Sequence, residues 1–196
     1  MSLVVFLVLL VAVVMLVALV KTTMDIFIVR TQHEHSSARS GGGPMRLPWV
    51  RDGYAVWDHR LGQLERRMLE LTNLERQRHP VESRRAKPLV WHEGAAQVAR
   101  QFGLDLATRG YFSHYSPEGE DAAARLTKSG VYFTAVAENL ARGYPSVESS
   151  TAAFMDEPRF QANHRGAILS SQFTHAGVGV IPDPRGGLVV VQLFLR

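Results

Sequence analysis

Two histidines and two glutamates are the side chains of this sequence best suited to chemistry. They lie in four separate short segments, as His114, Glu138, Glu157 and His164. Imidazoles are good ligands for Zn²⁺ and neighbouring transition metals. Carboxylates beside such a metal orient the imidazoles or act on a bound water molecule. One hypothesis is therefore a divalent metal held by His114 and His164, with positions left open for water and for metal-assisted hydrolysis.

The same four side chains also suit a site without a metal. Two imidazoles and two carboxylates in a half-buried place can neutralise each other, because unpaired charges there are costly. A nucleophilic mechanism has less support, since Ser113 and Ser116 are neighbours of His114 in sequence only, which does not create a triad. We favour a structural network over metal or ligand binding, place catalysis last, and expect no required cofactor.

The surrounding residues predict a mixed domain of helices and strands. Apolar residues at helical spacing from Leu61 predict a helix that Pro80 ends, and a second helix spans 93–109 before Gly110. Shorter helices are expected over 121–128 and from the capping residue Ser146 to 157. The segments 131–137, 177–181 and 188–195 predict strands, the last two forming a hairpin. Early helices followed by interleaved strands indicate a layered α+β fold.

Composition narrows the class of protein. The 196 residues include no cysteine, which excludes a disulfide framework and thiolate chemistry. A domain of about 140 residues buries enough surface to fold without such bridges. The net charge is +4, and the positive excess lies in residues 31–87 rather than on a basic, aromatic face of the folded part. We therefore expect no nucleic-acid partner.

The N-terminal segment predicts a membrane anchor. Residues 3–20 are uninterrupted apolar residues, which as a helix span about 27 Å. That is close to the hydrocarbon thickness of about 30 Å. No basic residues precede this segment and no small-residue cleavage motif follows it, so we expect residues 1–30 to stay attached as an anchor with its flank. Lys21, Arg30 and Arg39 follow the span, and on the positive-inside rule alone they favour a cytoplasmic domain.

Residues 31–60 are predicted to be a linker between the anchor and a domain at 61–196. Serine, glycine and proline are frequent in this segment. Three aromatic residues are unusual in a spacer, namely Trp49, Tyr54 and Trp57. Amphipathic aromatic rings suit the lipid headgroup region or a protein interface. We therefore name these three as candidate interface residues.

Several ordered segments resemble the CAP superfamily of cysteine-rich secretory, antigen 5 and pathogenesis-related proteins, and above all its bacterial SCP-like branch. They include GYFSH at 110–114, AENL at 137–140, HRGAIL at 164–169 and FTHAGVG at 173–179. The resemblance implies a three-layer αβα sandwich, here preceded by one transmembrane helix. It also implies a cleft lined by the tetrad His114, Glu138, Glu157 and His164. Ala137 and Asn163 stand where the family usually has glycine, and Phe154 replaces a common tryptophan.

These observations together favour a protein that works by binding rather than by catalysis. The expected role is a membrane-tethered accessory or stabilising subunit of a larger membrane complex, with the lipid bilayer and other subunits, of respiratory or photosynthetic type, as partners. The expected location is the bacterial inner membrane, single-pass, with the domain in the periplasm, because the resemblance to an exported family outweighs the flanking charges. The alternative is an envelope metal-dependent hydrolase, or a protein that binds lipid, glycan or peptide at the tetrad.

Overall fold

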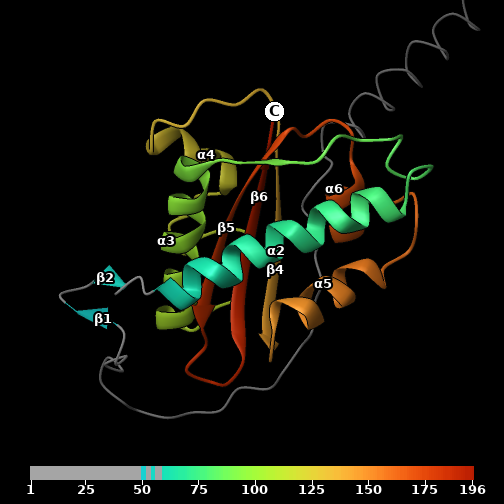
Figure 1. Cartoon of the computed structure of the whole chain (residues 1–196). Coiled ribbons are helices and arrows are strands. Elements are labelled where there is room, and N and C mark those ends of the chain that lie inside the picture. Colours follow the sequence, from blue (N-terminus) through green and yellow to red (C-terminus); the bar gives the residue numbers. More distant parts are fainter. Residues whose placement is uncertain (1–49, 52–53, 56–58) are drawn as a thin grey trace, which may run out of the picture.

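A four-stranded sheet forms the middle layer of the domain (Figure 1). The computed structural model describes residues 50–51, 54–55 and 59–196. The strands are β3 (Val90–Trp91), β5 (His175–Pro182), β6 (Leu188–Leu195) and β4 (Val136–Tyr144), in that order across the sheet. β3 pairs with β5 in parallel, and the other neighbours are antiparallel. β4, which carries Glu138, is therefore an edge strand.

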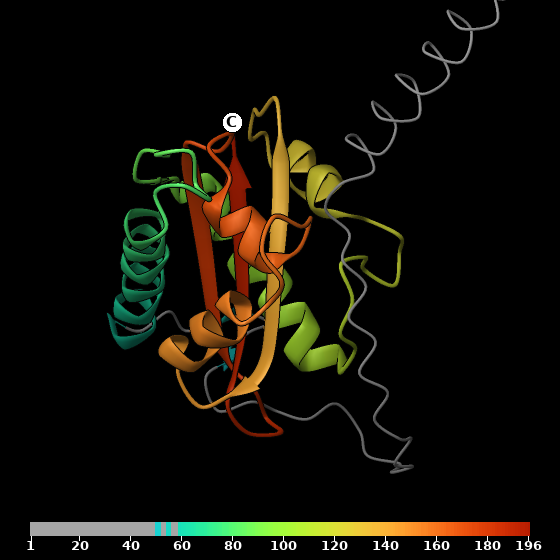
Figure 2. The same cartoon turned by 90° about the vertical axis from the view of Figure 1, so that its right-hand side faces the viewer.

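Helices cover both faces of this sheet, as the view in Figure 2 shows. One face carries α2 (His59–Arg78), α5 (Val147–Met155) and α6 (His164–Leu169). The other carries α3 (Glu93–Arg109) and α4 (Ala122–Lys128). Apolar side chains pack on both sides, with Phe194 and Val178 toward α2, and Leu193 and Val191 toward α3. The alternation along β6 buries both faces, as a central strand requires, and the result is the three-layer αβα arrangement expected from the sequence.

Helix α3 lies close to β5 because small residues meet there. A Cβ added at Gly179 would come within 2.5 Å of the backbone carbon of Ala99, and one at Gly177 would overlap the backbone of Ala95 and Ala96. The ends of α3 are set locally. His92 caps its start, and Gly110 ends it with φ of 76°, a left-handed conformation that glycine adopts readily. The observed bounds equal the predicted ones, and the loop after Gly110 leads directly to His114.

A buried arginine connects the end of α2 to the segment before β3, to the end of α6 and to the segment before β5. Arg76 is 2% exposed and donates hydrogen bonds to the carbonyl oxygens of Lys87, Ile168, Ser170 and Phe173. Burial lowers its pKa to about 10, so the guanidinium stays charged at neutral pH. This one side chain therefore joins the segment after α2 to α6 and to the start of β5.

The predicted strand at 131–137 is wrong in position. The strand β4 spans Val136–Tyr144 and includes Glu138, Asn139 and Arg142, polar residues that an apolar pattern does not select. Residues 131–135 instead form the connection from α4, in which the Val131 amide donates to the carbonyl of Leu126. The predicted hairpin of 177–181 and 188–195 is confirmed by the β5–β6 pairing. The short elements β3 and α6 of the domain were not predicted, and α5 ends at Met155 rather than at 157.

The N-terminal predictions fall mostly outside the described residues. The anchor at 3–20, Trp49 and Trp57 belong to that part of the chain, and Tyr54 is described by its backbone alone. A short antiparallel pairing joins β1 (Val50–Arg51) to β2 (Tyr54–Ala55), within the segment predicted as linker. The first long helix begins at His59, two residues before the predicted start. Among the helices that the structure describes, none has the length and apolar character needed to cross a bilayer.

Candidate functional site

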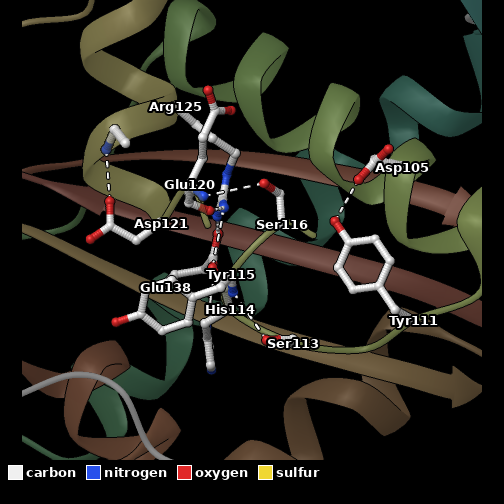
Figure 3. Close-up of polar contacts among 11 residues, drawn as sticks. Asp105, Tyr111, Ser113, His114, Tyr115, Ser116, Glu120, Asp121, Arg125 and Glu138 are labelled. Carbon is white, nitrogen blue, oxygen red and sulfur yellow. Dashed lines mark hydrogen bonds and ion pairs between the residues drawn. The ribbon is translucent and has the colours of Figure 1, made fainter. Parts of the chain in front are cut away.

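His114 lies in the connection between α3 and α4, and its position depends on Arg125 of α4. One guanidinium nitrogen of Arg125, Nη1, donates to the carbonyl oxygens of His114 at 3.1 Å and Glu120 at 2.7 Å. Within the same connection, Ser116 Oγ accepts from the amide of Glu120 at 3.2 Å. Figure 3 shows Arg125 reaching from its helix to this turn and to Glu138. The loop is therefore held from within the α3–α4 layer.

The first pair of the tetrad is His114 with Glu138. The imidazole Nδ1 lies 2.9 Å from Glu138 Oε1, and Arg125 Nη2 donates to Glu138 Oε2 at 2.5 Å. The side chain of His114 is 15% exposed, that of Glu138 4% and that of Arg125 9%. A carboxylate this deeply buried needs such partners, since leaving it unpaired would cost several kcal/mol. Arg125 supplies a permanent positive charge, whatever the protonation of His114.

The guanidinium of Arg125 also stacks on an aromatic ring. Its Cζ lies 3.4 Å from the ring centroid of Phe102 on α3, a cation–π contact. In the part of the chain that the structure describes, Arg125 Nε is the buried side-chain nitrogen that has no hydrogen-bond partner. Stacking against Phe102 explains how this nitrogen is tolerated, because the ring replaces solvent over the charged plane.

The second pair is His164 with Glu157. The two atoms His164 Nδ1 and Glu157 Oε1 are 2.6 Å apart, and the amide of Arg165 donates to Glu157 Oε2 at 3.3 Å. Asn163 caps the start of α6 through a 2.8 Å hydrogen bond from the amide of Gly166. Phe154 of α5 stacks on the imidazole with centroids 4.7 Å apart and an interplanar angle of 26°. This pair therefore belongs to the α5–α6 layer.

The two pairs come from opposite faces of the sheet and meet at its edge strand β4. Glu138 points toward α3 and α4, where it meets Arg125, whereas its neighbour Asn139 points toward α6. Asn139 Nδ2 donates to the carbonyl of His164 at 3.1 Å and lies 3.3 Å from Gln192 Oε1. Gln192 in turn donates to Thr72 on α2 at 2.8 Å. Among the described residues no direct hydrogen bond or ion pair joins one His–Glu pair to the other.

Both imidazoles use Nδ1 for the carboxylate, which leaves Nε2 for an added ligand. Within residues 59–196 neither Nε2 takes part in a hydrogen bond. A histidine that donates Nδ1–H to a carboxylate and offers Nε2 outward has the arrangement found in many metal sites. The described part of the chain contains no group of three or more His, Asp or Glu side chains placed to hold a metal ion. The metal site proposed from the sequence, with His114 and His164 as its two protein ligands, stays a prediction.

The neighbouring serines take part in the turn instead of facing the imidazole. Ser113 Oγ accepts from the amide of Tyr115, and Ser116 Oγ accepts from the amide of Glu120. In the described residues neither hydroxyl bonds to a histidine ring. Tyr111 and Asp105 form a separate pair in the same region of Figure 3, with Tyr111 Oη donating to Asp105 Oδ2 at 2.5 Å. Burial, followed by the hydrogen bond to Asp105, raises the pKa of Tyr111 well above its usual range, so the phenol stays protonated.

An open hollow of about 600 Å³ lies away from the tetrad. Its lining residues come from the first half of α2, with Arg100 from α3: His59, Gly62, Gln63, Glu65, Arg66, Arg67, Glu70 and Arg100. Its arginines are engaged. Arg67 bonds Glu148, Arg100 bonds the fully buried Glu65, and Arg66 stacks on Trp91 with 3.8 Å from Cζ to the ring centroid. The hollow and the tetrad share no residue.

Three partners of the tetrad were missed by sequence reasoning, namely Arg125, Asn139 and Arg165. Arg125 is buried on a short helix, next in sequence to the buried Leu126. A charged residue within the otherwise apolar face of a predicted helix is a signal that could have pointed to a buried counterion. Asn139 gives a weaker signal, because its role depends on α6 lying against an edge strand.

Comparison with known proteins agrees with the fold. The chain belongs to the CAP family, described as the cysteine-rich secretory protein family, whose sequence profile matches residues 55–194. It is 31% identical over 131 residues to YkwD of Bacillus subtilis (strain 168), covering 67% of this chain and 46% of that protein. It is 34% identical over 116 residues to YlbC of the same strain, described as a membrane protein, covering 59% of this chain and 31% of YlbC. The chain thus spans less than half the length of these curated relatives.

Solved structures show the same fold. An extracellular protein of Bacillus anthracis str. Ames containing an SCP domain is 28% identical with a TM-score of 0.60, over 69% of this chain and 41% of that one. A cysteine-rich secretory protein of Staphylococcus aureus subsp. aureus Mu50 is 22% identical with a TM-score of 0.54, over 70% of this chain and 39% of that one. At the lower identity the likeness concerns the fold alone.

Proposed function

We propose that this chain is a membrane-tethered CAP-domain protein that works by binding, as an accessory or stabilising subunit of a larger membrane complex. The observation that carries the proposal is the internal pairing of the tetrad. Each imidazole is bound to a carboxylate, and each carboxylate has a second donor, Arg125 or the Arg165 amide. Groups neutralised in this way are suited to holding a structure together, and no serine nucleophile faces either histidine in the described residues.

The tether rests on the sequence. The apolar residues 3–20 are long enough for a single span, and the relative YlbC is described as a membrane protein. We place the anchor in a bacterial inner membrane and the domain on the periplasmic side. Subunits of a respiratory or photosynthetic assembly would be suitable partners, with Trp49, Tyr54 and Trp57 near the contact. A reporter that is active on one side of the membrane only, fused after Arg196, tests the topology.

Mild detergent extraction of the full chain, followed by native-gel separation and mass spectrometry, tests the subunit role. The chain should migrate with other membrane proteins at a defined mass. A matched variant with Trp49, Tyr54 and Trp57 all changed to serine should release the chain while leaving it in the membrane fraction. Migration of the unchanged chain by itself, across several mild detergents, would contradict the proposal.

A second candidate function is binding of a divalent metal or of another ligand at the tetrad, either as a hydrolase or as a binding protein for lipid, glycan or peptide. It is favoured by one observation, the absence of any hydrogen bond at Nε2 of His114 and His164 within residues 59–196. Zinc bound there would supply a water of lowered pKa, while the carboxylates on Nδ1 would keep the imidazoles oriented.

Zinc analysis of the full chain after dialysis against a Zn²⁺ buffer tests this candidate. One zinc per chain is expected, with loss in His114→Ala/His164→Ala. The control is His92→Ala/His175→Ala, which removes the capping histidine before α3 and the first residue of β5, both outside the tetrad. Equal zinc content in both double variants would exclude the tetrad as the metal site.

A further inference from the structure

At one end of the molecule, a buried ion pair connects the loop after α2 to helix α6, which directly follows a second loop. The first loop follows α2 and covers residues 79–89, and the second, residues 156–163, connects α5 to α6 (Figure 1). Arg165 donates to both oxygens of Glu82, at 2.8 Å and 2.7 Å, and these side chains are 6% and 9% exposed. Arg165 Nη1 also donates to the carbonyl of Met155 at 2.5 Å, and the Phe160 amide donates to Glu82. The pair therefore fixes each loop relative to the other.

The backbone of these two loops is strained at three residues. In the described part of the chain, the residues other than glycine with positive φ are Arg84 at 51°, Arg85 at 54° and Phe160 at 56°. All three belong to the two joined loops. Positive φ is uncommon for a bulky side chain such as phenylalanine. Residues kept in such conformations are often found at functional sites, where the surrounding structure holds them in place.

The side chains presented there are apolar and basic. Val81 is 85% exposed and Phe160 is 76% exposed, although exposing an apolar side chain to water is unfavourable. In the same loops Arg84, Arg85 and Lys87 are exposed in the first, and Arg159 in the second. Asp156 is the exposed acid of the two loops, since Glu82 is bound to Arg165 and Glu157 to His164. The positive charge of the two loops is thus largely uncompensated.

We propose that these two loops form a tip that docks on the anionic surface of a lipid bilayer, with Val81 and Phe160 entering the headgroup region and Arg84, Arg85, Lys87 and Arg159 contacting the headgroups. Exposed aromatic and aliphatic side chains within a basic surround suit the membrane interface. A protein partner would need an apolar pocket with an acidic rim at one place. An anionic bilayer has negatively charged headgroups above an apolar core at every point of its surface. The tip adds a second contact to the anchor of the proposed function and would orient the domain on the membrane.

The absence of cysteine in the chain allows a direct test with a single label. The full chain is reconstituted into vesicles of phosphatidylcholine with or without about one third phosphatidylglycerol, a content chosen to give a strongly negative surface. An environment-sensitive dye is placed at Gln161→Cys, next to Phe160, and for comparison at Ser129→Cys on the opposite layer. Both positions are exposed. Lipids carrying a quencher then report which label reaches the bilayer.

The expected result is strong quenching of the label at 161 in anionic vesicles and weak quenching at 129. Adding Arg84→Glu/Arg85→Glu should reduce the quenching at 161 about tenfold or more toward the level at 129, since each basic residue near such a surface contributes about a factor of five. The control Arg109→Glu/Lys128→Glu changes the net charge equally on the α3–α4 layer and should leave the signal unchanged. Phe160→Ser should weaken quenching without affecting the ion pair, which circular dichroism and thermal unfolding would verify.

Equal quenching at 161 and 129 in anionic vesicles would overturn the proposal. So would a label at 161 that responds in native membranes but not in lipid vesicles, because this would identify a protein as the occupant. Flotation of the vesicles reports the anchor separately. A chain that floats with vesicles while its tip stays in water would retain the tether and lose the docking surface.

Discussion

Glu138 and Asn139 are adjacent on β4, yet their side chains connect opposite layers of the domain. Glu138 binds His114 and Arg125 on the α3–α4 side, while Asn139 donates to the carbonyl of His164 on the α6 side at 3.1 Å. This follows from the alternation of side chains along a strand. It makes the edge strand the physical link between two His–Glu pairs that do not contact each other directly in the described structure.

Loss of Arg125 should be strongly destabilising. Arg125→Met leaves the Glu138 carboxylate buried without its permanent cation, and breaking a buried pair in this way costs about 3–5 kcal/mol. Urea unfolding followed by tryptophan fluorescence measures the change. Arg125→Met/Glu138→Gln should regain a large part of the loss, because no unpaired charge remains. Arg109→Met, in the exposed pair with Glu118, is the control and should cost at most about 1 kcal/mol; equal effects of the two single changes would refute the role given to Arg125.

Asn139→Ala should cost about 1–3 kcal/mol, because the buried His164 carbonyl and Gln192 lose a hydrogen-bond partner. Asn139→Asp should be worse at neutral pH, since a carboxylate would face the acceptor oxygens of both groups. Unfolding at pH 7 compares the variants. If Asn139→Asp proved as stable as the parent chain, the amide orientation described here would be wrong.

Two glycine-to-alanine changes, one at the α3–β5 contact and one on α2, should have opposite effects on stability. In Gly179→Ala the new Cβ would lie 2.5 Å from the backbone carbon of Ala99, so helix and strand must separate. Overpacking of this kind typically costs about 1–3 kcal/mol. Gly62→Ala adds its Cβ where nothing lies within 4 Å. Within helix α2 it should stabilise by about 0.5–1 kcal/mol. Thermal unfolding of both variants would show a drop for Gly179→Ala and a rise for Gly62→Ala.

The loop ion pair predicts a specific acid sensitivity. The hydrogen bond from Arg165 is the main cause of a lowered pKa at Glu82, against the opposing effect of burial. Because the folded-state pKa lies below the unfolded value of about 4.3, the stabilisation is fully present above that pH. It is lost as the pH falls through the folded-state pKa. The stability difference between the parent chain and Glu82→Gln should therefore be constant from about pH 5 to 8 and shrink below about pH 4.

The double change Glu82→Gln/Arg165→Met is the control for this pH dependence. It lacks both partners, so its stability relative to Glu82→Gln should not vary in the acid range. If the parent chain kept its stability advantage over Glu82→Gln unchanged down to about pH 2, the pairing with Arg165 would not lower the pKa of Glu82.

Local signals explain which elements were predictable. Helix α3 was predicted with its observed bounds because both ends are encoded by neighbouring residues, among them Gly110. The β5–β6 hairpin was predictable for the same reason, from two apolar segments around a glycine and proline turn. β4 was misplaced because its polar residues have partners from distant segments. Arg142, for example, binds both oxygens of Asp183, at 2.5 Å and 3.1 Å, across the sheet.

By itself the sequence determined the family, the layered fold and the four side chains of the tetrad, because residue types, helix ends and short ordered segments are local properties. The tertiary structure alone decided that His114 pairs with Glu138 and His164 with Glu157, and that Arg125 and Asn139 complete the two pairs. It also decided that Arg165 of α6 binds Glu82 in the 79–89 loop. The packing of the layers against the edge strand decides which side chains become neighbours. A charge buried there needs an opposite charge or a hydrogen-bond donor beside it.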